Sequence, residues 1–139
     1  MAGDTVAGTW LGRYACTQGT TGLALRVDVL SPSRVHALFH FFADASNPAV
    51  PEGCFEMDGV FDPRTRRIEL KAGRWLSRRY GFVTVDLAGR LAADGGTMSG
   101  QVIGPSRTSF ELHPAGIRVP PDDRVCRTRG DVVASVAQP

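Results

Sequence analysis

The sequence predicts an all-β protein: a single antiparallel up-and-down β-barrel of about eight strands, followed by a flexible or loosely packed C-terminal tail. Alternating apolar and polar residues recur in segments about 8–15 residues apart, turn-forming residues lie between the segments, and no stretch has convincing helical periodicity. Eight consecutive strands can remove their exposed edges by closing into a ring. A sandwich of the same strands is the main alternative.

The first expected strand, Gly8–Cys16, sets the pattern for the rest of the chain. Because strand side chains alternate, Trp10 and Tyr14 point to one face, with Gly12 between them. Both aromatic residues carry a large apolar body with one polar group. The glycine leaves room for a neighbouring backbone or a ligand to approach. We interpret Trp10 first as a core anchor and second as a stacking surface for a ligand.

The remaining strands follow in order, each bounded by turn residues such as Ser-Pro at 31–32 and Gly-Gly at 95–96. They are expected at Leu23–Leu30, Arg34–Ala43, Cys54–Phe61, Arg67–Leu76, Phe82–Leu91, Thr97–Ile103 and Ser109–His113. We therefore divide the chain into a disordered N-terminus (1–7), a barrel domain (8–113) and a tail (114–139). Within the tail, Asp131–Ala137 is a candidate short helix behind an aspartate cap.

Segment Arg34–Ala43 is the most apolar of the series. A half-buried strand should have one polar face, yet Leu38 and Phe42 lie opposite Phe39 and Phe41. The outer face of this strand should therefore be covered as well. The sequence leaves two candidates for the cover: the tail, or a second copy of the chain in a homodimer.

Composition narrows the classes of partner. The chain has 139 residues, enough for one domain with one core, and its 42% hydrophobic and 22% charged residues are near globular averages. A net charge of +2 is too small to indicate nucleic acid. No run of apolar residues is long enough for a membrane span, and the N-terminus lacks the features of a signal peptide. We expect no membrane or nucleic-acid partner.

The three cysteines do not make a disulfide framework. Cys16 and Cys54 would lie across the barrel from each other, so we expect free thiols and a cytoplasmic location. His36 and His40 are about 13 Å apart along one strand, too far for two ligands of one zinc ion. No metal site and no cofactor are expected.

With these residues in view, the chain resembles the calycin superfamily, which contains the lipocalin, fatty-acid-binding and avidin barrels. Those proteins open with a Gly-x-Trp on the first strand, as in Gly8-Thr9-Trp10 here, and Thr97-Met98-Ser99-Gly100-Gln101 is similar to a late-strand avidin motif. Met98 replaces a tryptophan that contacts the ligand in avidins. The resemblance implies a barrel over residues 8–113, and it implies that Arg107 lies over the tryptophan, as a basic residue does in lipocalins.

The favoured function is a non-catalytic barrel that binds a small apolar or aromatic molecule in its lumen. Such pockets are mostly apolar, with a few placed polar groups. The expected binding residues are six for the wall and two for a polar group at the mouth: Trp10, Tyr14, Phe39, Phe41, Phe55 and Met57, then Arg74 and Arg107.

Two other functions stay open. One is a protein-interaction module whose lumen is filled by the same side chains and which works through Leu38, Phe42 and the loops. The other is a small lipocalin-like isomerase or cyclase, in which Tyr14, His36 or His40 would move a proton. The enzyme requires one of these three groups inside a cavity. A filled lumen would favour the interaction module.

Overall fold

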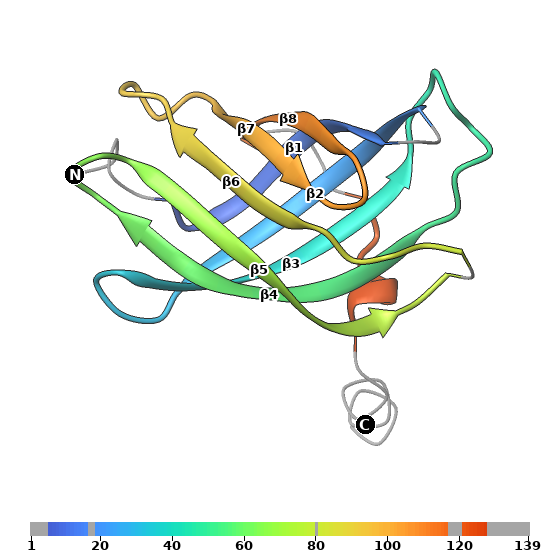
Figure 1. Cartoon of the computed structure of the whole chain (residues 1–139), viewed down its shortest axis with the longest axis horizontal. Coiled ribbons are helices and arrows are strands. Elements are labelled where there is room, and N and C mark those ends of the chain that lie inside the picture. The colour runs from blue at the N-terminus through green and yellow to red at the C-terminus, as the bar shows by residue number, and fades with distance from the viewer. Residues whose placement is uncertain (1–5, 17–18, 80, 117–120, 128–139) are drawn as a thin grey trace.

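Eight strands close into one antiparallel barrel in the computed structural model, which describes residues 6–16, 19–79, 81–116 and 121–127. Each strand pairs with the next along the chain, and β8 pairs back onto β1 (Figure 1). The all-β up-and-down barrel expected from the sequence is confirmed. Among the described residues, no helix has the length and apolar character that crossing a membrane requires.

Most strand bounds agree with the alternation pattern to within a few residues. The strands are β1 (Gly8–Cys16), β2 (Gly19–Val29), β3 (Arg34–Ala43), β4 (Gly53–Asp62), β5 (Arg67–Ser77), β6 (Asp86–Leu91), β7 (Met98–Ile103) and β8 (Arg107–Pro114). A single turn of 3-10 helix, η2 (Arg124–Cys126), follows. The candidate helix at Asp131–Ala137 lies outside the described residues.

Strand β6 is shorter than expected, because it begins at Asp86 and not at Phe82. Its ladder with β5 has only four residue pairs, from Arg67↔Arg90 to Leu70↔Leu87. The Asp86 carboxylate then accepts a hydrogen bond from the Ala72 backbone N–H (2.8 Å), and from there β5 continues without β6. Residues 82–85 alternate like a strand, but they belong to the loop that joins β5 to β6.

Strand β5 contains the irregularity that decides which of its side chains point inward. Its register with β4 shifts twice, from Met57↔Ala72 to Phe55↔Trp75 and then to Cys54↔Ser77. Each shift inserts one extra residue into β5 and bends it. As a result Trp75 turns into the barrel, while Arg74 points outward and pairs with Glu56.

The two ends of the barrel differ. At the end where β1 starts and β8 finishes, the indole Nε1–H of Trp10 donates to the Val6 carbonyl (2.9 Å), and both residues are buried. Val6 falls within the N-terminus expected to be disordered, yet it packs in the core; residues 1–5 lie outside the described part. The opposite end, called the mouth here, carries the loops 44–52, 78–85 and 104–106.

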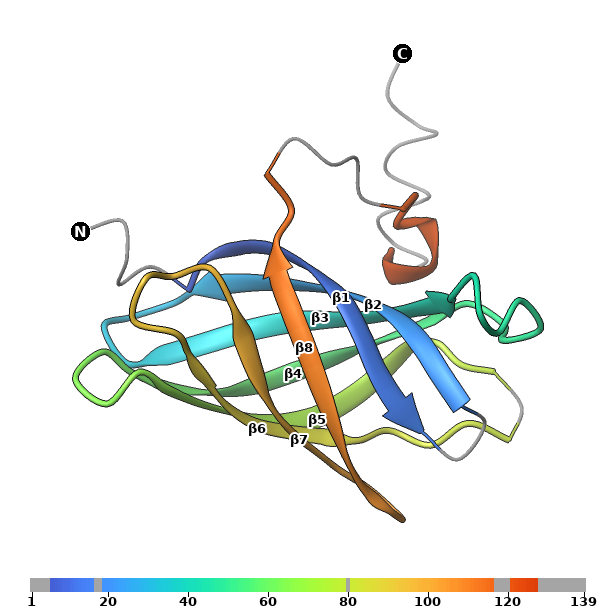
Figure 2. The ribbon, with the colours of Figure 1, turned by 90° about the horizontal axis from the view of Figure 1, so that it is seen from above.

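The C-terminal segment 121–127, called the strap here, lies against the outside of the barrel (Figures 1 and 2). A disulfide joins Cys126 in η2 to Cys54 on the outer face of β4, with 5.2 Å between the Cα atoms. The expectation of a free thiol at Cys54 is therefore wrong, because its partner comes from the segment that was read as a loose tail. The side chain of Cys16 is not among those described. A cytoplasmic location was inferred partly from free thiols, and it loses that support.

Candidate ligand site at the barrel mouth

Six aromatic rings occupy the mouth half of the barrel interior. Phe39 stacks on Phe55 with centroids 4.6 Å apart, and the Tyr14 ring meets Phe39 edge-on at 5.2 Å. The indole of Trp75 meets Phe55 edge-on at 5.2 Å and Phe41 at 6.1 Å. Such offset and edge-to-face arrangements are the ones that aromatic pairs prefer. The mouth half of the interior is thus an aromatic cluster.

Phe82 completes this cluster, and it alone comes from a loop. Its ring lies flat on Phe41, with centroids 5.0 Å apart and an angle of 5° between the planes. The residue is half-buried, whereas Phe41 beneath it is 1% exposed. Its backbone N–H donates to the Arg79 carbonyl (3.0 Å), which forms a turn within the 78–85 loop. Phe82 is therefore a ring placed by a loop on the face of a core ring.

Two hollows flank the Phe82 ring. One, of about 90 Å³, lies between the 78–85 loop and the ends of β1, β7 and β8, and is lined by Tyr14, Ala15, Gly81, Phe82, Val83, Val85, Val102, Pro105, Ser106 and Thr108. The other, of about 220 Å³, lies under the 44–52 loop and is lined by Asn47, Ala49, Val50, Pro51 and Phe82. Phe82 is the one residue named in the lining of both hollows, so both adjoin it.

Polar contacts hold the mouth loops in place. The Arg79 guanidinium Nε–H donates to the Glu52 carbonyl, which ties the 78–85 loop to the 44–52 loop. Asp44, at the start of the 44–52 loop, pairs with Arg13 of β1 (3.0 Å). Hydrogen bonds from the Ser46 hydroxyl and backbone N–H, followed by the Arg13 charge, lower the pKa of the Asp44 carboxyl below its usual value.

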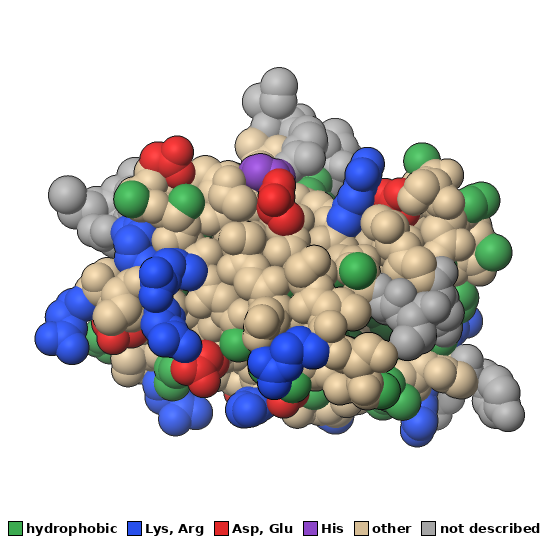
Figure 3. All heavy atoms as spheres, turned by 45° about the horizontal axis from the view of Figure 1, so that its top comes forward, with side chains coloured by type: hydrophobic (Ala, Val, Ile, Leu, Met, Phe, Trp, Pro, Cys, Tyr) green, Lys and Arg blue, Asp and Glu red, His purple; other side chains and the backbone are tan. Residues whose placement is uncertain are grey.

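On the face that bears β6, β7 and β8, the surface near the mouth carries exposed charged side chains, such as Arg107, together with apolar ones. Figure 3 shows Lys, Arg, Asp and Glu side chains interspersed over that face, with several hydrophobic side chains along its right-hand edge. Val83, in the 78–85 loop, is 55% exposed. The mouth thus presents apolar groups to an approaching molecule.

The six residues expected to line the lumen lie together in the buried core: Trp10, Tyr14, Phe39, Phe41, Phe55 and Met57. They pack on one another and on further core residues, so they occupy the interior. Neither arginine lies with them. Arg74 is 67% exposed and pairs with Glu56 on the outside of the barrel (2.8 Å), and Arg107 donates to the exposed Gln101.

The lipocalin resemblance implied that Arg107 lies over Trp10, and this expectation is wrong. Trp10 is paired with Pro114 and Arg107 with Ile103, so the two residues are at opposite ends of β8, about 23 Å apart along the strand.

Two mouth residues were missed in the sequence. Trp75 was not named, because strict alternation through β5 would place it outside, and Gly73, two residues before it, was the available sign of a bulge. Phe82 was assigned to a strand. The break in alternation at Gly81, whose backbone φ is +82°, was the signal that the chain turns there.

Both histidines of β3 point away from the interior. His40 is 3% exposed and its Nε2 lies 2.6 Å from Glu52 Oε2, while His36 lies 3.7 Å from Glu56. Of the three groups named for an isomerase or cyclase, only Tyr14 faces the barrel interior. Within the described residues, no cluster of three or more His, Cys, Asp or Glu side chains could hold a metal ion.

In comparisons with known proteins, no protein-family model, curated protein or solved structure matches the chain.

Proposed function

We propose that the chain is a non-catalytic, calycin-like binding barrel that holds a small aromatic or apolar molecule at its mouth. The observation that supports this function best is the Phe82 ring, which lies flat on Phe41 and comes from a loop. An aromatic ligand would take the place that Phe82 now occupies. Its polar groups would remain near the loops, since the arginines expected to orient them project outward.

The hollow beside Tyr14 is too small to accept an aromatic ring by simple addition, so a ligand there would have to exchange with the Phe82 ring. A cavity of roughly 150 Å³ is known to accept benzene, and the 90 Å³ hollow beside Tyr14 is smaller than that. When Phe82 swings out, this hollow joins the 220 Å³ hollow under the 44–52 loop and uncovers the face of Phe41. The wild-type barrel is therefore partly occupied by its own side chain.

This competition gives a direct test with indole and naphthalene as probes, using titration calorimetry and native mass spectrometry. We expect Phe82→Ala to bind the probes about tenfold more tightly than wild type, because the ligand no longer has to displace the ring. Val29→Ala, at an exposed position on the end of β2 away from the mouth, is the matched control and should bind like wild type. No binding to any of the three proteins, or equal affinities, would overturn the proposal.

The second candidate is a protein-interaction module that forms a homodimer through β3. It is favoured by the packed interior and by Phe42, a half-buried ring on the outer face that lies so close over Gly22 that a Cβ there would clash with it. Leu38, the other residue named for this contact, lines a hollow under the strap. A dimer would thus be centred on the Phe42 end of the strand.

Sedimentation velocity tests the dimer. We expect wild type to sediment as a dimer and Phe42→Ser as a monomer, since the substitution removes the central apolar contact. Val60→Ser is the control, because Val60 is an apolar residue on β4 that is 48% exposed and lies away from Phe42. A monomeric wild type, or the same dissociation in both variants, would contradict the interaction module.

A further inference from the structure

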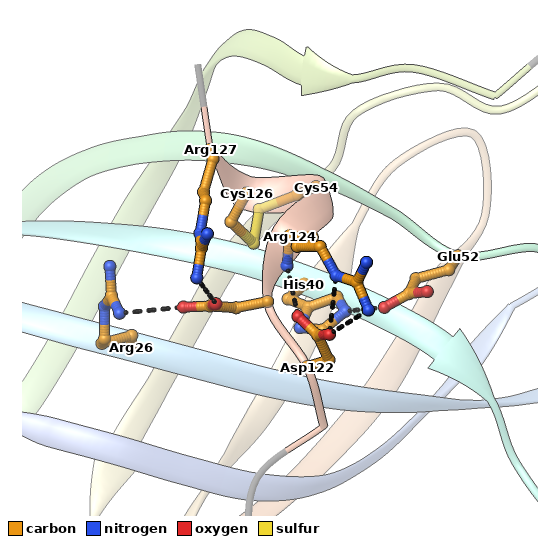
Figure 4. Close-up of polar contacts among 9 residues, drawn as sticks. Arg26, His40, Glu52, Cys54, Asp122, Arg124, Cys126 and Arg127 are labelled. Atoms are coloured by element: carbon orange, nitrogen blue, oxygen red, sulfur yellow. Dashed lines mark hydrogen bonds and ion pairs between the residues drawn. A yellow bond between two sulfur atoms is a disulfide. The ribbon is translucent and has the colours of Figure 1, made fainter. Parts of the chain in front are cut away.

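The disulfide is the one covalent link between the described part of the strap and the barrel, and few polar contacts accompany it. Within the described residues, the only hydrogen bond or ion pair between segment 121–127 and the barrel joins Asp123 to Arg26 (3.2 Å). Both side chains are about half exposed, and exposed pairs of this kind contribute little. Figure 4 shows this pair beside the bond between Cys54 and Cys126.

The other polar contacts of the strap are internal to it. Asp122 accepts hydrogen bonds from Arg124, Asp123 pairs with Arg127, and the Cys126 N–H donates to the Asp123 carbonyl. These contacts shape one helical turn without joining it to the sheet. A single turn is not stable alone, and ordering the segment costs conformational entropy that one exposed ion pair does not offset.

Beneath the strap lies an apolar part of the barrel wall. Ala24 on β2 is 7% exposed, Leu38 on β3 is half-buried, and His40 next to it is 3% exposed. Together with Pro121, Asp123 and Cys126 of the strap they line a hollow of about 90 Å³. The strap therefore covers this wall and leaves a small hollow between the two.

We propose that the Cys54–Cys126 disulfide is a redox-operated clasp, which holds the strap over the outer wall and releases it when a dithiol reduces the bond. Cys54 is fully buried and Cys126, on the strap, is 8% exposed, so a reductant would approach the bond from the Cys126 side. One thiolate of the dithiol bonds to Cys126 Sγ, and Cys54 leaves and takes up a proton. The second thiol then displaces Cys126, which is also protonated, and the dithiol becomes a disulfide.

The barrel is expected to survive this opening. All eight ladders that close it lie within residues 8–114, and none of them includes a strap residue. Opening uncovers Ala24, Leu38 and His40, and leaves the mouth and Phe82 unchanged. The clasp is thus independent of the ligand proposed for the mouth.

The test compares the full chain before and after treatment with dithiothreitol, a dithiol. Mass spectrometry after thiol alkylation identifies which cysteines are bonded, amide exchange follows residues 121–127, and trypsin reports access to the bond after Arg124. On reduction we expect strap amides to exchange at least about tenfold faster and cleavage after Arg124 to accelerate similarly, while the far-ultraviolet circular dichroism of the barrel is retained. Cys126→Ser should show the open behaviour without reductant, and Cys16→Ser should behave like wild type.

Three results would overturn the clasp. One is alkylation of both Cys54 and Cys126 in the protein before reduction, which would mean that the bond does not form. The second is a strap whose exchange and cleavage rates are the same with and without reductant, which would mean that non-covalent contacts hold it. Loss of the barrel signal on reduction would also contradict the proposal, because the bond would then be a requirement of the fold.

Discussion

Gly12 lies on the inner face of β1, where the β8 backbone passes close to it. A Cβ at this position would collide with the Glu111 carbonyl oxygen and approach the Leu112 Cα to 2.9 Å. Trp10 and Tyr14 on either side can therefore point inward while the two backbones remain in contact between them. The sequence predicted that a neighbouring backbone or a ligand would approach Gly12. In the structure, the group that approaches it is the backbone of β8.

Three aspartates stabilise turns, because the carboxylate of each accepts a hydrogen bond from the residue two positions later. The pKa of each carboxyl is lowered: for Asp44 mainly by the Ser46 side chain, for Asp62 by the Arg64 backbone N–H, and for Asp122 by the Arg124 side chain. A carboxyl whose folded pKa lies below its unfolded value near 3.8 adds stability above that value. That stability is lost as the pH falls through the lowered pKa.

We therefore predict that acid weakens the fold partly through these turns. The urea midpoint of wild type should fall between about pH 5 and about pH 2, and the triple variant Asp44→Asn, Asp62→Asn, Asp122→Asn should show a shallower fall over the same range. Amides keep an oxygen acceptor but do not titrate in this range. Circular dichroism at a series of pH values measures both curves, and parallel curves would show that these carboxylates do not carry the acid sensitivity.

Among the elements, those with uninterrupted alternation were predictable and those with a break were not. In β1 and β3 the large inward residues follow the pattern, because the buried inner face and the period of two fix their direction, although Leu11 and His40 on the outer faces are buried too. In β5 the alternation rule fails after Ala72, where the strand bulges. A bulge does not alter the residue types of a strand, so Gly73 is the only sign of it in the sequence. This failure reversed the faces of Arg74 and Trp75.

The strap was unpredictable for a different reason. Its contact with β4 joins positions 72 residues apart through one covalent bond, and neither Cys54 nor Cys126 carries a local signal of the other. The apolar outer face of β3 did indicate that something covers it, and at Leu38 and His40 the cover is the strap. The tail was one of the two candidates named for the cover, but the choice between them depends on where the chain runs after β8, which no local pattern shows.

At the scale of the whole molecule, the aromatic composition of the lumen was foreseeable and its occupancy was not. Inward positions of β1, β3 and β4 carry the rings that alternation assigned to them. How far those rings fill the space depends on the bulge that adds Trp75 and on the loop that adds Phe82. A barrel of eight strands is just wide enough to be filled by side chains or to hold one small ligand, so two rings decide between these states.

The disulfide also acts on the whole chain, through the unfolded state. Cross-linking residues 72 positions apart restricts the unfolded ensemble, by about 4 kcal/mol on a chain-entropy estimate. Domains of this size are stable by roughly 5–15 kcal/mol, so the reduced protein should remain folded with a clearly smaller margin.

We predict that reduction lowers the free energy of unfolding by about 2–5 kcal/mol, as for other native disulfides. The measurement is urea unfolding followed by circular dichroism on the oxidised and reduced wild type, with Cys16→Ser as a control that should match wild type in both states. The slope against urea should rise on reduction, because the unfolded chain becomes more expanded once the bond is gone. An unchanged midpoint and slope would mean that the bond does not restrict the unfolded chain, and the barrel ladders and core would then account for the whole of the stability.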